Sequence, residues 1–169
     1  TYQNVMQPWS TLNKNSEAAG TQAVTALGNI VKVFGMARIT DMYGPIPYSK
    51  FGTALKVAYD SQEDIYRQFF NELDNAIDVL TEYYSANSSS KVLAKFDFVF
   101  GGNTASWIKF ANTLRLRLAL RVCYADEALA RAEAEKSISH SLGFLEAKAE
   151  HCNDSKYSYL NPFWEITNS

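Results

Sequence analysis

The residues best suited to chemistry in this chain are aromatic. Tyr157, Tyr159 and Trp164 lie in one short stretch near the end of the sequence, and Trp9 lies near its start. Sugar rings present C–H faces that stack on aromatic rings, while nearby amides and carboxylates bond the hydroxyls. These four residues are therefore the candidate glycan contacts. The alternative is that the same rings only cover helices or pack on another part of a longer chain.

No pattern typical of catalysis accompanies these aromatics. The only imidazoles belong to His140 and His151, and no nucleophile or orienting acid is recognisable beside them. These histidines and the two cysteines, Cys123 and Cys152, do not have the spacing of a zinc site. The stretch "FGGNT" lacks the lysine and the spacing of a phosphate-binding loop. The absent motifs disfavour an enzyme, and we expect no metal or cofactor.

Three arginines, Arg115, Arg117 and Arg121, lie in a run that is apolar nearly all round. An arginine buried there needs a carboxylate or several carbonyl groups, because an unpaired buried charge is very costly. We therefore expect at least one arginine to hold a loop through backbone carbonyls or through an acid such as Asp41. An anion-binding site is the functional alternative.

The composition narrows the class of protein. The 169 residues include 16 basic and 18 acidic side chains, which gives a net charge of −2. This balance does not build the positive field that nucleic acid binding needs, so we expect no nucleic acid partner. No run approaches the 18 apolar residues of a membrane span. Hydrophobic residues make up 47% of the chain, which is enough for a globular core.

The elements that must position these residues are helices. Apolar periodicity predicts helices over residues 17–43, 59–84, 105–124 and 125–140, with a shorter one at 2–14 that Pro8 should interrupt. Asp60 is the expected N-cap of the 59–84 helix. Gly28 and Gly35 lie on one face and predict the close approach of another helix. "KFDFVF" at 95–100 alternates and predicts a short extended piece.

The architecture expected from these elements is all-α, with antiparallel helix pairs stacked in layers. Residues 1–169 are predicted to form a single helical domain. Within it, residues 151–169 show no period and predict an irregular, aromatic-rich segment. The stretch "MYGPIPYSK" at 42–50 predicts a helix end followed by a rigid extended corner, because its prolines fix φ. We expect Tyr43 and Tyr48 to pin this corner against the helices.

Three motifs in order resemble the SusD/RagB outer-membrane lipoproteins. They are "ITDMYGPIPYSK" at 39–50, "YDSQEDIY" at 59–66 and "WIKFANTLRLRLALR" at 107–121. One departure is Pro45, where the family usually has a polar or acidic residue. The resemblance implies a fold of tetratricopeptide-like helix pairs, an α-α superhelix with long loops. It also implies that this chain is part of a longer one.

The resemblance further implies a binding protein on the cell surface. Such proteins are held in the outer membrane by a lipid anchor, which would lie outside this chain. They cap a TonB-dependent outer-membrane transporter and deliver polysaccharides or oligosaccharides to it. The expected partners are thus a glycan ligand and that transporter. The alternative is a helical-repeat scaffold for protein–protein interaction without direct sugar binding, because stacked helix pairs commonly offer a protein-binding groove.

Overall fold

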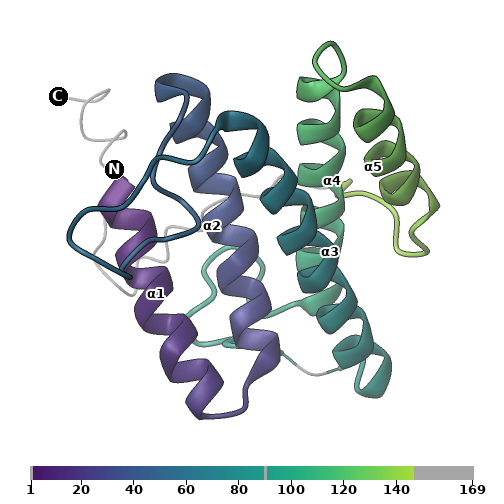
Figure 1. The fold of residues 1–169 in the computed structure, drawn as a ribbon. Helices are drawn as coiled ribbons and strands as arrows, with labels where there is room; N and C mark the ends of the chain where they lie inside the picture. The colour runs from purple at the N-terminus through teal and green to yellow at the C-terminus, as the bar shows by residue number, and fades with distance from the viewer. Residues whose placement is uncertain (1, 90, 147–169) are drawn as a thin grey trace, which may run out of the picture.

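The computed structural model describes residues 2–89 and 91–146. Helices that are consecutive in the chain pack against each other and run in opposite directions (Figure 1). No β-strand occurs within the described part of the chain, which confirms the all-α prediction and its antiparallel helix pairs. The helices are α1 (Tyr2–Ala18), α2 (Gln22–Tyr43), α3 (Gln62–Ala86), α4 (Thr104–Val122) and α5 (Glu127–Ser139).

The centre of the core lies along α3. Its apolar positions recur every three or four residues and therefore share one face, as the sequence predicts. The residues of this stripe are all buried, and they pack with the inward faces of α2 and α4. They are Ile65, Phe69, Leu73, Ala76 and Leu80. Because α2 and α4 cover α3 on both sides, α3 sets the distance between these two helices.

The two glycines of α2 allow α1 to approach closely. A Cβ at Gly28 would lie 2.7 Å from Cδ2 of Leu12, and one at Gly35 would lie 3.0 Å from Cγ2 of Val5. The first distance is shorter than a real Cβ contact and the second is tight, so a side chain at either position would require Leu12 or Val5 of α1 to shift. The predicted close helix approach is confirmed.

The first two helices are divided differently from the prediction. Pro8 lies inside α1 without ending it, so the expected interruption is wrong. Packing along α1, where Met6 is fully buried, outweighs the local cost of a proline in a helix. The chain turns instead at Gly20, whose φ is +65°, and α2 begins only at Gln22.

The turn between α2 and α3, residues 44–61, is here called the corner. Its Ile46 pairs with Asp60 in an isolated antiparallel bridge, which confirms an extended piece after the helix. Tyr48 is buried as predicted, but Tyr43 is 67% exposed and pins nothing. Gly44 combines a φ of +72° with a ψ of −130°, a region essentially restricted to glycine.

The predicted cap of α3 is wrong by one residue. Ser61 is the N-cap, and its hydroxyl accepts the backbone N–H of Asp64 at 3.1 Å. Asp60 bonds the corner instead: its carboxylate accepts the backbone N–H groups of Tyr48 at 2.8 Å and Ser49 at 2.7 Å. A carboxylate that ties the corner to the start of α3 is not available as a cap.

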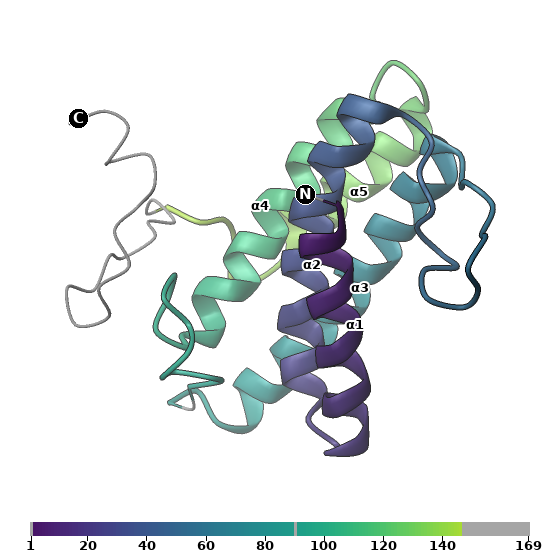
Figure 2. The same ribbon diagram turned by 90° about the vertical axis from the view of Figure 1, so that its left-hand side faces the viewer.

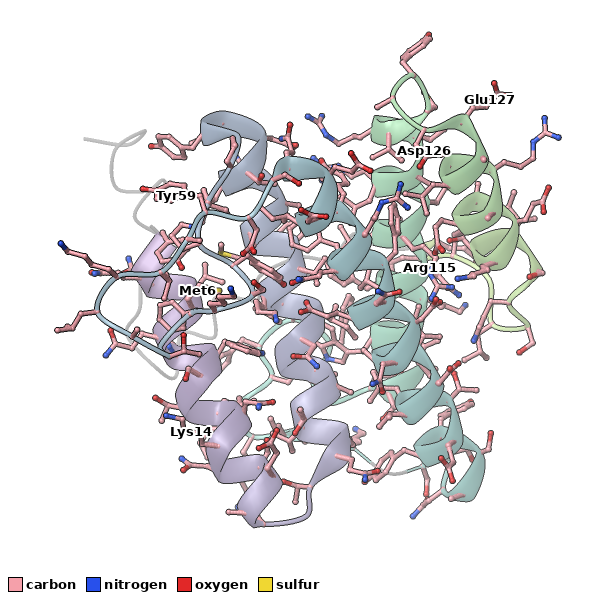
Figure 3. All side chains as sticks on the ribbon, viewed as in Figure 1. Met6, Lys14, Tyr59, Arg115, Asp126 and Glu127 are labelled. Carbon is pink, nitrogen blue, oxygen red and sulfur yellow. The ribbon has the colours of Figure 1, made fainter. Side chains whose placement is uncertain are left out.

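Two of the three arginines of α4, Arg115 and Arg121, are paired with acids, and the partner of Arg121 is Asp41, the acid that the sequence suggests as a candidate. Arg121 bonds Asp41 at 2.9 Å, and buried Arg115 bonds Asp74. Both acids lie on neighbouring helices, so these pairs join helices and do not hold a loop. Figure 3 shows Arg115 where α4 meets its neighbours. Leu120 is 64% exposed, so α4 is not enclosed near its end.

Candidate functional site

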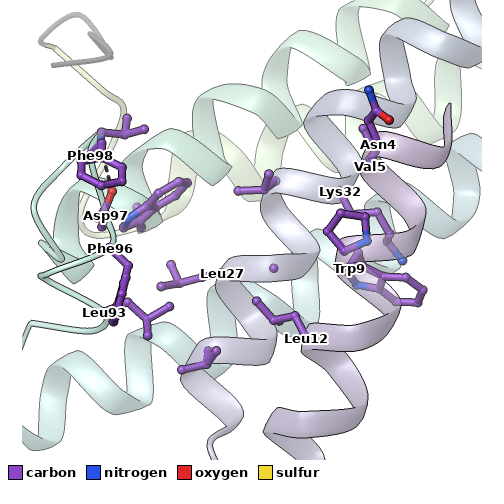
Figure 4. A pocket seen from close by; sticks show the side chains of 16 residues that line it. Asn4, Val5, Trp9, Leu12, Leu27, Lys32, Leu93, Phe96, Asp97 and Phe98 are labelled. Carbon is purple, nitrogen blue, oxygen red and sulfur yellow. Dashed lines mark hydrogen bonds between the residues drawn. The ribbon is translucent and has the colours of Figure 1, made fainter. Parts of the chain in front are cut away.

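The first candidate site is an apolar groove between α1, α2 and the loop of residues 91–103 (Figure 4). Its volume is about 480 Å³. Leu12 and Leu27 come from the two helices, and Figure 4 shows Leu93 and Phe96 of the loop on the opposite side. Phe96 is 73% exposed, so the loop side of the groove is open to solvent.

One carboxylate organises the loop. Asp97 accepts the backbone N–H groups of Val99 at 3.0 Å, Phe100 at 3.1 Å and Gly102 at 2.7 Å. It also accepts the indole N–H of Trp107 at 2.7 Å. These bonds wrap the chain in turns around the carboxylate, so the predicted extended piece at 95–100 is wrong.

The charge of Asp97 is stabilised by these donors. Burial by itself raises the pKa of the Asp97 carboxyl. The Trp107 indole and the backbone N–H groups outweigh burial and hold the pKa below its usual value of 3.8. Asp97 is therefore a structural anion whose bonds are already made, and it has little capacity left for a ligand.

Trp9 lies at the wall of the groove and is partly buried. Its Nε1 donates to Oδ1 of Asn29 at 2.7 Å. The Lys32 ammonium lies 3.8 Å from the ring centroid, which is a cation–π contact. Asn29 thus occupies the indole N–H of Trp9, and Lys32 occupies part of one face of its ring. Trp9 as a glycan contact remains a prediction.

Lys32 belongs to a buried cluster behind the groove. It is 3% exposed, and its Nζ lies 2.8 Å from Oε1 of Glu72. The hydroxyl of Tyr48 donates to the other Glu72 oxygen at 2.5 Å. Burial lowers the pKa of Lys32, and the Glu72 carboxylate opposes that effect. Burial also raises the pKa of Tyr48, and Glu72 adds to it. The cluster joins α2, the corner and α3.

The second candidate site is a polar hollow, the end pocket, where the ends of α2, α3, α4 and α5 meet. Its volume is about 390 Å³. Tyr66 donates to Asp41 at 2.6 Å, and Arg121 bonds the same carboxylate and donates to the Tyr66 hydroxyl at 3.2 Å. Gln62, Glu63 and Asp126 complete the polar lining, and Figure 3 shows Asp126 at the start of α5.

Burial raises the pKa of Tyr66 to about 12, with a further contribution from Asp41. The phenol therefore stays protonated at neutral pH and can donate or accept a hydrogen bond. An aromatic ring beside carboxylates and a guanidinium can both stack on a sugar and bond its hydroxyls. Because it offers a phenol, carboxylates and a guanidinium, the end pocket suits a hydroxylated ligand better than the apolar groove does.

Neither a metal-binding cluster nor a membrane-spanning helix is found among the described residues. Within residues 2–89 and 91–146 there is no cluster of three or more His, Cys, Asp or Glu side chains arranged to hold a metal ion. In the same part of the chain, no helix has the length and apolar character needed to cross a membrane.

Comparison with known families identifies the chain. The SusD-like family, described as Susd and RagB outer membrane lipoprotein, matches residues 1–169. The chain belongs to the SusD/RagB family. A comparison with curated proteins gives no significant match.

Solved structures of SusD homologues agree with this assignment. One from Bacteroides uniformis is 43% identical with a TM-score of 0.74, over 85% of this chain and 28% of that one. A chitin-binding homologue from Flavobacterium johnsoniae is 43% identical with a TM-score of 0.80, over 85% and 30%. One from Bacteroides vulgatus is 36% identical with a TM-score of 0.80, over 94% and 33%.

These matches have two consequences for the SusD-like chain. Its fold is that of the tetratricopeptide-like helix pairs of SusD homologues, as the three motifs imply. The family is one of outer-membrane lipoproteins, which agrees with the expected location. The chain spans about a third or less of the length of the homologues it matches.

The structure tests only part of the predicted site. Tyr157, Tyr159 and Trp164 lie outside the described residues, as does the whole segment 151–169. Of the four candidate glycan contacts, only Trp9 is described, and it lies in the groove.

Sequence reasoning missed the end pocket. The sequence predicts Asp41 only as an arginine partner, and it marks Tyr66 only as the last residue of the second family motif. Four helices contribute to this pocket, so no spacing within one helix could reveal it. The one available signal was that Asp41, Tyr66 and Arg121 each belong to one of the three family motifs.

Proposed function

We propose that this chain is part of a cell-surface glycan-binding protein. In this proposal the protein captures polysaccharides or oligosaccharides and delivers them to a TonB-dependent outer-membrane transporter. The observation that carries the proposal is the chitin-binding SusD homologue, which is 43% identical over 85% of this chain. Residues 1–169 would form one helical domain of a longer protein, attached to the membrane through a lipid anchor outside this chain.

Binding without catalysis is the role that the polar groups support. In the end pocket, Asp41 is already bonded to both Tyr66 and Arg121. The raised pKa of Tyr66 makes its phenol a poor base at neutral pH, since the proton remains on the oxygen. Such groups serve a sugar as fixed hydrogen-bond partners. We therefore propose a binding protein and not an enzyme.

The proposed contacts fall into two sets. The first consists of the aromatic residues Trp9, Tyr157, Tyr159 and Trp164. The second is the end pocket, where Tyr66 lies beside charged groups that can bond hydroxyls. Because the end pocket and the groove that holds Trp9 have no lining residue in common, variants of Tyr66 and Trp9 test the two sets separately.

The test is glycan binding by the full-length protein, measured by isothermal titration calorimetry against chitin oligosaccharides and a panel of soluble polysaccharides. We expect at least one glycan to bind. Tyr66→Phe, which keeps the ring and removes the hydroxyl, should weaken it about five- to tenfold if the end pocket is used. Trp9→Phe tests the aromatic set. Tyr124→Ala is the matched control, because that ring is fully exposed and lines neither hollow.

Two results would overturn the proposal. Failure of every glycan in the panel to bind the folded protein would remove the binding role. Release of reducing sugar from any of them would show an enzyme.

A protein-binding scaffold is the second candidate function, and one observation favours it. Large apolar side chains are exposed on three helices, namely Met42 on α2, Leu120 on α4 and Ile138 on α5. Contiguous patches of exposed apolar side chains mark sites of protein association, so the scaffold role requires these three side chains to act as one surface. Co-purification of a TonB-dependent transporter with the full-length protein would test this role. Tight transporter binding without retention by any glycan would favour the scaffold over direct capture.

A further inference from the structure

A third hollow, here called the amide pocket, lies between α1, α2 and α3 beside the turn that joins α1 to α2. Its volume is about 360 Å³, which is at the small end of the range for ligand pockets. Amide and hydroxyl side chains make up most of its polar lining, namely those of Ser16, Gln22, Thr25, Asn29 and Asn75. Among the described residues that line it, Glu17 alone is charged.

The amide pocket and the groove use different faces of α2. The residues of α2 that line the amide pocket are Gln22, Thr25, Ala26 and Asn29. Those that line the groove are Val24, Leu27, Gly28, Val31 and Lys32. Because a helix turns by about 100° per residue, the two sets point in nearly opposite directions. Figure 2 shows the 91–103 loop, which borders the groove, to one side of α2. A ligand in the amide pocket therefore leaves the groove open.

The side chain of Asn29 connects Trp9 to the amide pocket. Its Oδ1 accepts the Trp9 indole N–H at 2.7 Å. An indole can only donate, so this bond fixes which end of the amide faces Trp9. The Nδ2 group has no acceptor among the described residues. Because Asn29 lines the amide pocket, the two N–H groups of Nδ2 are available to a ligand there.

Gln22 and Asn75 bring two more amides to the same hollow. Both residues are exposed, and neither side chain has a hydrogen-bond partner among the described residues. An amide both donates and accepts, which matches a sugar hydroxyl that does the same. Ala76 and Val79 add apolar surface to the lining, which suits the C–H groups of a sugar ring. Three amides from two helices thus present unused hydrogen-bonding groups to one small hollow.

The charge of the lining restricts the kind of sugar. No lysine or arginine occurs among the described residues that line the amide pocket. A uronic acid or a sulfated sugar would meet the Glu17 carboxylate there without a cation to pair its charge, and like charges placed together oppose binding. We propose that the amide pocket binds an uncharged sugar unit through Gln22, Asn29 and Asn75. The inference rests on the proposed function for the class of ligand, and it adds a separate place of contact and a charge preference.

Isothermal titration calorimetry of the full-length protein with chitin oligosaccharides and uncharged polysaccharides tests the contact. Gln22→Ala and Asn75→Ala each remove an amide without removing a bond inside the described part of the protein, so the fold should be kept. We expect each to weaken binding about fivefold, the usual effect of one lost hydrogen bond. The matched control is Asn71→Ala, which is exposed one turn earlier on α3 and does not line the pocket. It should stay within about twofold of wild type.

An acidic glycan tests the charge preference. The wild-type protein should bind polygalacturonate more weakly than it binds the uncharged glycans. Asn75→Lys places a cation in the amide pocket and should raise the affinity for polygalacturonate about two- to fivefold over that of the control Asn71→Lys, because only the first lysine faces the pocket.

Three outcomes would overturn this proposal and leave the proposed function standing. Unchanged glycan binding in both Gln22→Ala and Asn75→Ala would place the sugar elsewhere on the protein. An equal loss in Asn71→Ala and Asn75→Ala would show that the effect does not come from the pocket. Tighter wild-type binding of polygalacturonate than of any uncharged glycan would contradict the charge preference. Failure of the wild-type protein to bind any glycan would instead remove both this role of the amide pocket and the proposed function.

Discussion

The corner at residues 44–61 and the loop at residues 91–103 are built in the same way. Each connects two helices, each contains a glycine at positive φ, and each is organised by one aspartate. Asp60 accepts two backbone N–H groups and the Ser49 hydroxyl in the corner. Asp97 accepts three backbone N–H groups and an indole N–H in the loop.

The two connections differ in what their aromatic side chains contact. Tyr48 of the corner is 3% exposed and reaches Glu72 behind the helices, whereas Phe96 of the loop is 73% exposed. The corner also carries one exposed ring, Tyr59, which is 69% exposed. A carboxylate that collects backbone donors fixes a turn but does not decide where the side chains go. The corner completes the core, and the loop forms one wall of an open groove. The loop is distinguished by the groove that it borders, because both connections leave an aromatic ring exposed.

The largest expected effect comes from removing the buried anchor of the corner. Glu72→Ala leaves Lys32 without its carboxylate and Tyr48 without its acceptor. Breaking a buried pair by removing one partner costs about 3–5 kcal/mol, because the remaining charge is uncompensated. Urea denaturation should show this loss in the free energy of unfolding. Glu63→Ala is the control, since its pair with Arg67 is exposed to solvent and should contribute little to stability. Equal losses in both variants would contradict a buried anchor.

Asp97→Ala tests whether the loop depends equally on its carboxylate. Three of its donors, the Phe100 and Gly102 N–H groups and the Trp107 indole, are partly buried, while the exposed Val99 N–H can return to water. We expect a loss of about 3 kcal/mol, since hydrogen bonds to a charged group contribute about 1.5–3 kcal/mol each. Thermal denaturation should report it, together with a changed near-ultraviolet dichroism from Trp107. A loss no larger than that of Asp60→Ala would mean that the Trp107 bond adds nothing.

The glycines of the two connections should respond differently to alanine. At Gly102, where φ is +81°, a Cβ would lie 2.8 Å from the Val92 carbonyl oxygen and 2.9 Å from Cα of Ala94. At Gly44, where φ is +72°, a Cβ would meet nothing within 4 Å. Gly44→Ala should therefore cost about 1–2 kcal/mol from backbone strain alone.

Gly102→Ala should cost about 1 kcal/mol more, because the backbone around Val92 must also move. Urea denaturation of the two variants side by side measures the difference. Equal losses of unfolding free energy in the two variants would indicate that the backbone around Gly102 moves at no cost. The predicted difference between the packed surroundings of Gly102 and the open surroundings of Gly44 would then be wrong.

The sequence determines the helices well because their signals are local. The stripe from Ile65 to Leu80 predicts a buried helix face, and that face is buried. Gly28 and Gly35 predict a close helix approach, and α1 lies there. The misplacement of the α3 cap from Ser61 to Asp60 has a physical cause. Both residues are good caps, and only the bond from the corner decides between them.

The candidate sites could not be found in the same way. The groove depends on how Asp97 folds the loop. The alternation in "KFDFVF" wrongly predicts an extended piece, because alternation gives no sign that the Asp97 carboxylate accepts backbone N–H groups and bends the chain. The end pocket collects Asp41, Tyr66 and Arg121 from three helices, so only the packing angles bring them together. Short-range patterns therefore predict elements, while sites between elements require the packed structure.

The smallest expected effect is in the acid dependence of stability. Burial by itself raises the pKa of Asp60, but bonds from Ser49 and Tyr48 outweigh it and lower the pKa, as the corresponding bonds do for Asp97. A carboxyl whose pKa is lower in the folded state stabilises the fold above the ordinary value of 3.8. That contribution is lost as pH falls through the folded value, because the unfolded chain binds the proton more readily.

Asp97→Asn and Asp60→Asn should each reduce the loss of unfolding free energy between pH 5 and pH 2, although each also lowers stability at pH 7. Urea denaturation across this pH range measures the slope. Because Asp97 is more buried than Asp60 and holds an indole as well as the backbone, we expect the loop variant to flatten the profile more. A larger flattening from Asp60→Asn would show that the corner is the more strongly bonded connection. It would also mean that the loop keeps its contact with Trp107 when the Asp97 carboxylate is protonated.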